Sequence, residues 1–273
     1  MGDRILVGTL RTVENEYEAC IAAIASQTNQ NFIHFVVRDL PDFEAHRVLY
    51  SRFMGNADEF DFFIKIDADM VLCSKRYFHR VVRFFAERPE VDQLSVAVLD
   101  FFCGRLIGAL HAFRSTVTWK VADRIFTDGG SNVPYQQVYD TEILAPAAFH
   151  CRNPSRTQAL RWGTHRGVKI IEAMRRGEHQ RVANHMRNRD AAWLRYISTQ
   201  DERVLLALYA LELTLLNEKA MIEASNYVDL ANEIEAEIHN MAAGKVFRAA
   251  TNLKFRNKSL ISDDRYASCP AGN

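Results

Sequence analysis

The stretch Phe60–Leu72, FDFFIKIDADMVL, predicts the central strand of the fold and the edge at which a ligand binds. Its first residues are mostly apolar, aromatic or β-branched, which is typical of a strand buried on both faces. It ends in two carboxylates, Asp67 and Asp69. Side chains two apart on a strand point the same way, and neighbouring carboxylates repel each other unless a cation lies beside them. We therefore expect a hard divalent metal here; the simpler alternative is a strand end with two solvated acids.

The residues before this stretch predict two β-α units. Strands are expected at residues 4–10 and 32–37, and helices at residues 15–27 and 43–56. The order β-α-β-α-β is typical of a parallel, doubly wound sheet, in which ligands bind beyond the carboxyl ends of the strands. Thr9 to Arg11, Asp39 and the two acids all follow strand ends. Their convergence favours a functional role for the acids.

Composition narrows the function classes. Of 273 residues, 48% are hydrophobic and 25% charged, which is ordinary for a globular protein. Lys+Arg and Asp+Glu number 34 each, so the zero net charge gives no sign of a nucleic-acid partner. The five cysteines are scattered without a CxxC pair, as expected of reduced thiols in a cytosolic protein. We expect neither a signal peptide nor a transmembrane segment, since the N-terminus has the pattern of a first strand.

The rest of the chain predicts a mixed sheet and then helices. Residues 94–99 and 106–113 are expected to pair as an antiparallel hairpin, with further short strands at 135–139 and 143–149. Ser155 and Gln158 form a capping box that opens a helix ending near residue 176. We expect an α/β domain over residues 1–176, a helical extension over residues 177–256, and a flexible tail over residues 257–273.

This pattern resembles the GT-A glycosyltransferases of the broad family-2-like group. The matching segments are ILVGTLRTVENE at 5–16, FVVRD at 35–39, Arg47, and FFIKIDADM at 62–70, with a weaker match at HCRNPS, residues 150–155. The resemblance covers roughly residues 4–175. It implies a GT-A fold, namely a Rossmann-like, mostly parallel sheet flanked by helices with a mixed second sheet, followed here by a helical extension.

The resemblance also implies roles for individual residues. The donor would be a nucleotide sugar, such as a UDP- or GDP-sugar, held with Mn²⁺ or Mg²⁺. Asp67 would contact the ribose or the metal, Asp69 would bind the metal, and His150 would be the late histidine, with His165 as the alternative. The residues implied for nucleotide contact are Thr9, Arg11, Glu14, Asp39 and Arg47. A divalent cation stabilises the charge that develops on the departing diphosphate, and Arg156 or Arg166 would add to this effect.

The general base is the point at which this chain departs from the family. Inverting members carry a pair of acids about a hundred residues after the D-x-D, and no clean pair stands there. The candidates are Asp100, Asp128, Asp140 and Glu142. Asp140 and Glu142 alternate like Asp67 and Asp69, so we take them as the catalytic pair that accepts the acceptor's hydroxyl proton. The alternative is that both are surface acids.

The resemblance also implies an acceptor, a pathway and a cellular location. It implies transfer to a saccharide or a lipid-linked acceptor in cell-envelope or polysaccharide biosynthesis, by a cytoplasmic protein that contacts the inner face of the membrane peripherally. The helical extension is a candidate for homo-oligomer contacts.

Two rival functions are left open. IDADMV also fits a phosphatase of the haloacid dehalogenase type, with Asp67 as nucleophile and Asp69 as acid/base, although that motif normally occupies a first strand. The other rival is a nucleotide-sugar-binding scaffold without activity, which the weak base motif favours.

Overall fold

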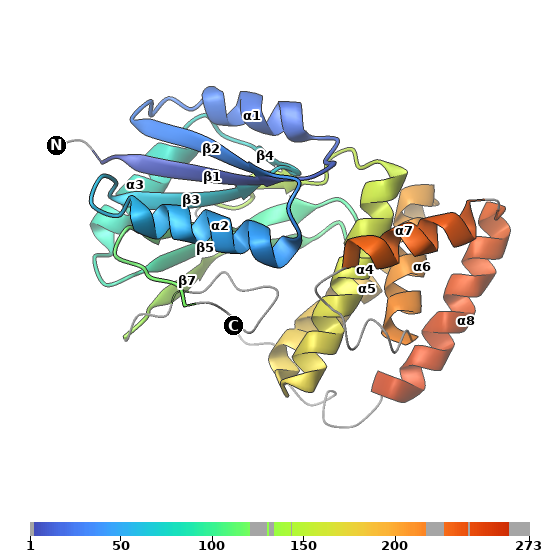
Figure 1. Ribbon diagram of the computed structural model, residues 1–273. Helices are drawn as coiled ribbons and strands as arrows, with labels where there is room; N and C mark the ends of the chain where they lie inside the picture. Colours follow the sequence, from blue (N-terminus) through green and yellow to red (C-terminus); the bar gives the residue numbers. More distant parts are fainter. Residues whose placement is uncertain are drawn as a thin grey trace. The chain divides into compact units, whose positions relative to one another are not determined.

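The chain divides into two compact units. The computed structural model describes residues 3–120, 130, 134–142, 144–216, 227–239 and 241–261. The sheet unit comprises Met1–Phe101 and Leu106–Asn153, and the helical unit comprises Phe102–Arg105 and Pro154–Asn273 (Figure 1). The division falls after residue 153, not at the expected residue 176, because the helix that follows packs on other helices.

The sheet unit is an α/β fold whose element order begins as expected. Its strands are β1 (Ile5–Arg11), β2 (Phe32–Arg38), β3 (Phe62–Asp67), β4 (Met70–Leu72), β5 (Gln93–Asp100), β6 (Leu106–Arg114), β7 (Gln137–Asp140) and β8 (Ala148–His150). Its helices are α1 (Tyr17–Ala25), α2 (Asp42–Gly55) and α3 (Tyr77–Glu87). The β-α-β-α-β prediction is confirmed, because β1 pairs in parallel with both β2 and β3.

The eight strands of the described residues belong to one mixed sheet, in the order β2-β1-β3-β6-β5-β8-β4, with β7 paired to β5. The antiparallel hairpin of β5 and β6 is confirmed. The expected separate second sheet is wrong, because β6 also pairs antiparallel with β3 and so joins the hairpin to the parallel strands. The short strand β8 lies between β5 and β4, parallel to the first and antiparallel to the second.

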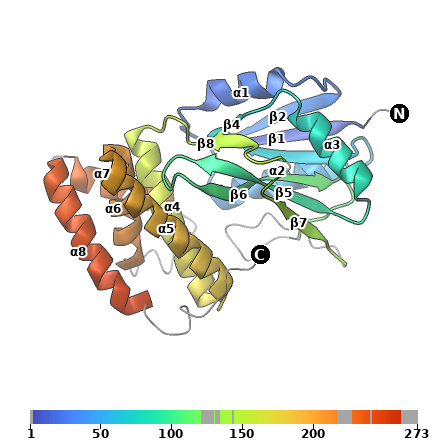
Figure 2. The same ribbon diagram turned by 180° about the vertical axis from the view of Figure 1, so that it is seen from behind.

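Helix α2 covers one face of the sheet and α3 the other (Figures 1 and 2). Under α2, Phe53 stacks on Phe63 with ring centroids 4.7 Å apart, and Tyr50 stacks on Trp119 at 4.6 Å. Burying aromatic rings of this size supplies much of the apolar stabilisation of a core. On the opposite face Phe85 of α3 stacks on Phe62, because neighbouring residues of a strand point to opposite faces.

The helical unit contains five helices among its described residues. They are α4 (Arg156–Arg175), α5 (His179–Thr199), α6 (Glu202–Leu216), α7 (Tyr227–Ile238) and α8 (Ala243–Ile261). The predicted capping box of Ser155 and Gln158 is confirmed at the start of α4. The backbones of α4 and α6 approach closely at Gly163, where an added Cβ would lie 2.0 Å from the carbonyl oxygen of Ala207.

The flexible tail expected over residues 257–273 stays a prediction. Helix α8 continues to Ile261, and the buried Asn257 donates to the backbone and side-chain oxygens of Glu212 on α6. The later part of the predicted tail, residues 262–273, lies outside the described residues. Within the described part of the chain, no helix combines the length and apolar character needed to cross a bilayer.

Candidate functional site

Three side chains with metal-ligating atoms converge where β8 ends. His150 is the last residue of β8, Cys151 follows it, and Asp69 lies in the turn between β3 and β4. The backbone fixes this arrangement, since β8 pairs Met70 with His150 and the Cys151 amide donates to the Asp69 carbonyl at 2.8 Å. Residues distant in sequence are thus held together by main-chain hydrogen bonds.

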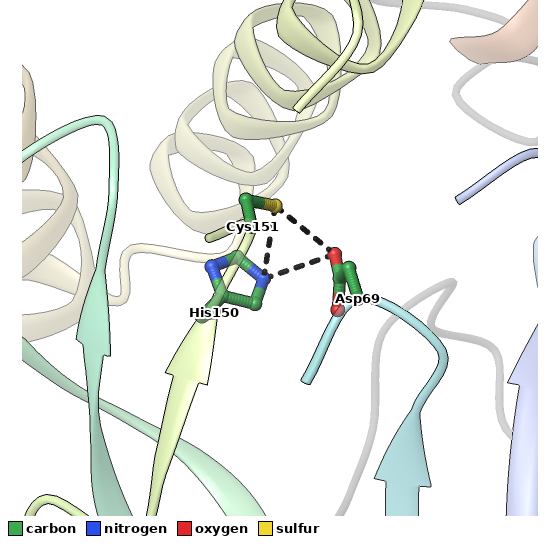
Figure 3. A group of neighbouring side chains, drawn as sticks. All are labelled: Asp69, His150 and Cys151. Carbon is green, nitrogen blue, oxygen red and sulfur yellow. Dashed lines mark hydrogen bonds and ion pairs between the residues drawn. The ribbon is translucent and has the colours of Figure 1, made fainter. Parts of the chain in front are cut away.

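The three side chains point toward one another (Figure 3). Asp69 Oδ2 lies 3.2 Å from His150 Nε2 and 3.2 Å from Cys151 Sγ, and the sulfur lies 3.9 Å from His150 Nε2. Asp69 and His150 are mostly buried, and Cys151 is buried. One ligand atom from each residue falls within 4.8 Å of the others, so they form a candidate metal-binding group.

A second carboxylate orients the histidine. Asp100, the last residue of β5, has no exposed surface, and its Oδ2 lies 2.7 Å from His150 Nδ1. This contact leaves Nε2 facing Asp69. A metal-ligating histidine characteristically donates its other ring nitrogen to a carboxylate in this way. The sequence had offered Asp100 as a candidate base, and the structure gives it a contact that positions His150.

We predict that Asp100→Asn weakens divalent-metal binding by about 10- to 100-fold, the usual cost of removing such a supporting carboxylate. The amide keeps the size of the side chain but withdraws the negative charge beside His150. Calorimetric titration of Mn²⁺ and Zn²⁺ would measure the loss. Asp58→Asn, at an exposed turn acid, serves as control; equal affinities in the wild type and Asp100→Asn would contradict the positioning role.

The charges of the group are strongly coupled. Burial raises the pKa of the Asp69 carboxyl, but the adjacent His150 outweighs it and leaves that pKa below its usual value. Burial lowers the pKa of His150, but Asp69 and Asp100 outweigh it, so the pKa lies well above the ordinary value. Without a metal, the His150 imidazolium therefore lies between the carboxylates of Asp69 and Asp100. Its positive charge occupies the place that a metal cation could take.

Burial, followed by the Asp69 charge, raises the pKa of the Cys151 thiol well above its usual value. Cys151 also has a φ of +51°, a left-handed conformation that is unusual for a residue other than glycine. Such conformations persist where the surroundings enforce them, often at functional sites.

Polar atoms without a hydrogen-bond partner lie at the edge of the sheet next to the metal-binding group. Among the described residues, Asp67 Oδ1, Asp69 Oδ1 and Arg11 Nε are buried without a hydrogen-bond partner. A buried polar atom left unpaired costs about 1–3 kcal/mol, so a cluster of them indicates a ligand site. Asp67 pairs in register with Leu10, the residue before Arg11, so these atoms belong to adjacent strand ends.

The two acids of the D-x-D do not point the same way along one strand, contrary to expectation. Strand β3 ends at Asp67, where the amide of Ala68 donates to the Leu10 carbonyl and the chain turns. Asp67 Oδ2 accepts a hydrogen bond from the buried Lys65 at 3.1 Å, whereas Asp69 faces His150. Asp69 and His150 are thus brought into one group, and Asp67 lies at its border with one oxygen unpartnered.

The loop after β1 is anchored near the group. Thr12 donates two hydrogen bonds to the Glu14 carboxylate, and burial followed by the Asp69 charge raises the pKa of Glu14. Glu16 accepts from the amide of Asn153, which ties this loop to the segment after Cys151. Glu14 therefore lies within electrostatic range of the metal-binding group.

An aromatic and cationic cluster lies beyond the ends of β1 and β2. The guanidinium groups of Arg11 and Arg38 lie over the ring of Tyr17, at 4.5 and 5.5 Å. Asp39 is exposed, has a φ of +53°, and donates its amide to the Arg11 carbonyl. Positive charge and an aromatic face so close to the unpartnered atoms suit a phosphorylated ligand with a flat base.

Two residues expected at the nucleotide have contacts directed elsewhere. Thr9 is fully buried, and its hydroxyl lies 2.9 Å from His34 Nε2 on β2. Arg47 is exposed on α2 and forms an ion pair with Glu44 of the same helix. Neither contact reaches the end of β3.

The expected catalytic pair forms a turn. Both oxygens of the buried Asp140 accept backbone hydrogen bonds, from Glu142 and Leu144, and the Glu142 side chain is exposed. Neither acid belongs to the metal-binding group. Asp128 lies outside the described residues, and His165 belongs to the helical unit.

Sequence reasoning missed Cys151 and the supporting roles of Asp100 and Lys65. The signal for Cys151 was its place beside His150 in HCRNPS. The direction of the thiol is determined by the left-handed backbone at Cys151 and by the insertion of β8 between β5 and β4. Neither feature has a local signature in the sequence.

Comparison with known proteins finds similarity to solved structures. No family model matches the chain, and no curated protein matches it. Among solved structures, A197 from STIV aligns with a TM-score of 0.28 and 16% identity over 35% of this chain and 47% of that one. The mannosyltransferase PcManGT from Pyrobaculum calidifontis, solved in complex with GDP-Man and Mn²⁺, aligns with a TM-score of 0.43 and 13% identity over 95% of this chain and 88% of that one.

Proposed function

We propose that the protein is a metal-dependent glycosyltransferase of the GT-A type, which moves a sugar from a nucleotide-sugar donor to an acceptor hydroxyl. The observation that carries this proposal is the pair of unpartnered, buried carboxylate oxygens of Asp67 and Asp69 beside His150. They lie at and just beyond the carboxyl end of a parallel strand, which is where α/β sheets bind their ligands.

The residues present fit a divalent cation. Asp69 and His150 would hold it, because they supply a carboxylate oxygen and an imidazole nitrogen 3.2 Å apart, with Asp100 behind the histidine. When bound, the cation supplies a positive charge that stabilises the diphosphate leaving group.

The chain's own residues would hold the rest of the donor. Lys65 anchors one oxygen of Asp67, so the other is available to accept a hydrogen bond from a ribose hydroxyl. Arg11, with its unpartnered Nε beside the Tyr17 ring, offers a donor to phosphate and a neighbouring surface for the base. Asp39 stays the predicted base contact, and Asp140 and Glu142 stay the predicted general-base pair.

The test is a binding screen of the full chain with UDP-, GDP-, CMP- and dTDP-sugars, each with and without a divalent cation. A ligand at 100 times its Kd stabilises the folded state by about 2.7 kcal/mol, which thermal denaturation detects. We expect one nucleotide class to raise the melting temperature only when the cation is present. The same samples should slowly release free sugar from that donor.

Other outcomes would contradict the proposal. Phosphate release from p-nitrophenyl phosphate that is lost in Asp67→Asn, without nucleotide binding, would show the phosphatase alternative. Metal-dependent binding without sugar release or transfer would show the scaffold alternative. The acceptor, the envelope or polysaccharide pathway, the cytoplasmic and peripheral-membrane location, and oligomer contacts through the helical unit stay predictions of the resemblance.

A further inference from the structure

The metal-binding group contains a sulfur atom, which neither of the predicted metals, Mn²⁺ and Mg²⁺, favours as a ligand. Its three atoms are a carboxylate oxygen of Asp69, an imidazole nitrogen of His150 and the sulfur of Cys151. Mg²⁺ takes oxygen ligands almost exclusively and keeps several waters, whereas thiolate and imidazole together suit Zn²⁺. The donor set therefore discriminates between metals.

The spacing of the three atoms also fits zinc. Bonds of about 2.0 Å to oxygen and nitrogen and about 2.3 Å to sulfur, arranged tetrahedrally, place the ligand atoms roughly 3.3–3.6 Å apart. The observed separations are 3.2, 3.2 and 3.9 Å, so each is within a few tenths of an ångström of such an arrangement. Three protein ligands leave the fourth position for a substrate oxygen, as in catalytic zinc sites.

The protein holds the sulfur in place. The Cys151 amide donates to the Asp69 carbonyl at 2.8 Å, and the left-handed backbone at Cys151 directs its side chain toward the same residue. Asp100 supports the histidine from the other side, with its Oδ2 2.7 Å from His150 Nδ1; zinc-bound histidines typically make such a contact with a carboxylate.

We propose that Asp69, His150 and Cys151 form a three-ligand centre that selects Zn²⁺ over Mg²⁺, with the Cys151 sulfur bound to the metal. As the metal binds, the Cys151 thiol proton and the Nε2 proton of the His150 imidazolium pass to the buffer, and no electron is transferred. The inference rests on the proposed function only for the metal's part in sugar transfer, because the identity of the metal is tested separately.

Co²⁺ is the probe, because it occupies zinc sites and reports its ligands by absorption. The full chain is freed of metal with a chelator and titrated with Co²⁺. We expect the intense near-ultraviolet band of a thiolate–Co²⁺ bond, together with the visible bands of four-coordinate Co²⁺. One equivalent of Zn²⁺ should remove both, and a thousand-fold excess of Mg²⁺ should remove neither.

Two variants and one measurement on the wild type make the test specific. Cys151→Ser should lose the near-ultraviolet band and bind Zn²⁺ more than about 100-fold more weakly, which exceeds the usual cost of changing a residue that only supports a ligand. Cys73→Ser, at an exposed cysteine of the same unit, should keep both properties. If Cys151→Ser does not fold, zinc X-ray absorption of the wild type should still show one sulfur at about 2.3 Å.

The outcomes separate the two proposals. Co²⁺ or Zn²⁺ bound without a sulfur ligand, or displaced equally well by Mg²⁺, would overturn the zinc inference and leave the glycosyltransferase proposal intact. Failure of every divalent metal to bind the wild type would overturn both. A sulfur-ligated metal in a protein that binds no nucleotide sugar would support the zinc centre and contradict the proposed function.

Discussion

Asp69→Asn is expected to abolish metal-dependent nucleotide binding, with metal affinity reduced more than about 100-fold. The substitution keeps the shape of the side chain but removes the charge that faces His150 and Cys151. A neutral amide is a poor ligand for a divalent cation, and without the cation the donor's diphosphate loses its main counter-charge. Calorimetry with metal alone, and then with the nucleotide identified by the screen, would measure both losses.

Asp58→Asn controls for the removal of one negative charge, because Asp58 is exposed in the turn after α2. It should bind metal and nucleotide like the wild type. Both variants should be compared by melting temperature without metal, so that a folding defect is recognised. Unchanged metal affinity in a folded Asp69→Asn protein would exclude Asp69 as a ligand.

Glu212→Leu is expected to destabilise the helical unit by about 3–5 kcal/mol, the usual cost of leaving one member of a buried ion pair alone. Arg189 donates to both oxygens of Glu212, at 2.7 and 2.9 Å, and neither residue is appreciably exposed. Trp193 and Asn257 donate to the same carboxylate. The substitution therefore leaves a guanidinium, an indole N–H and an amide without their shared acceptor. Urea unfolding followed by circular dichroism would measure the change.

The double variant Arg189→Met/Glu212→Leu distinguishes the ion pair from simple loss of packing. Removing both charges should restore a large part of the stability, because apolar side chains of similar size replace buried ion pairs well. Glu202→Gln is the matched control, since Glu202 pairs with Arg156 at an exposed position and should cost under about 1 kcal/mol. A double variant as unstable as Glu212→Leu alone would show that the stability does not depend on charge pairing.

The sequence by itself determined the elements around the site. Apolar runs closed by turn residues identified β1, β2 and β3, and their alternation with helices indicated the parallel pairing that the structure confirms. The capping box at Ser155 was readable because both of its hydrogen bonds join residues three apart. Asp69 was a candidate ligand from its position after an apolar strand, and His150 from the resemblance to the GT-A glycosyltransferases; the structure places the two side chains 3.2 Å apart.

The tertiary structure alone decided what those residues contact. Asp140 and Glu142 stay a predicted pair, and only the tertiary structure shows that both oxygens of Asp140 accept backbone hydrogen bonds from the turn that follows. Asp100 reaches His150, and Cys151 reaches Asp69, because β8 inserts between β5 and β4. Strand order and a left-handed residue depend on pairing between distant segments, which local composition does not encode. The pairing of the strands therefore decided which side chains meet in the candidate metal-binding group.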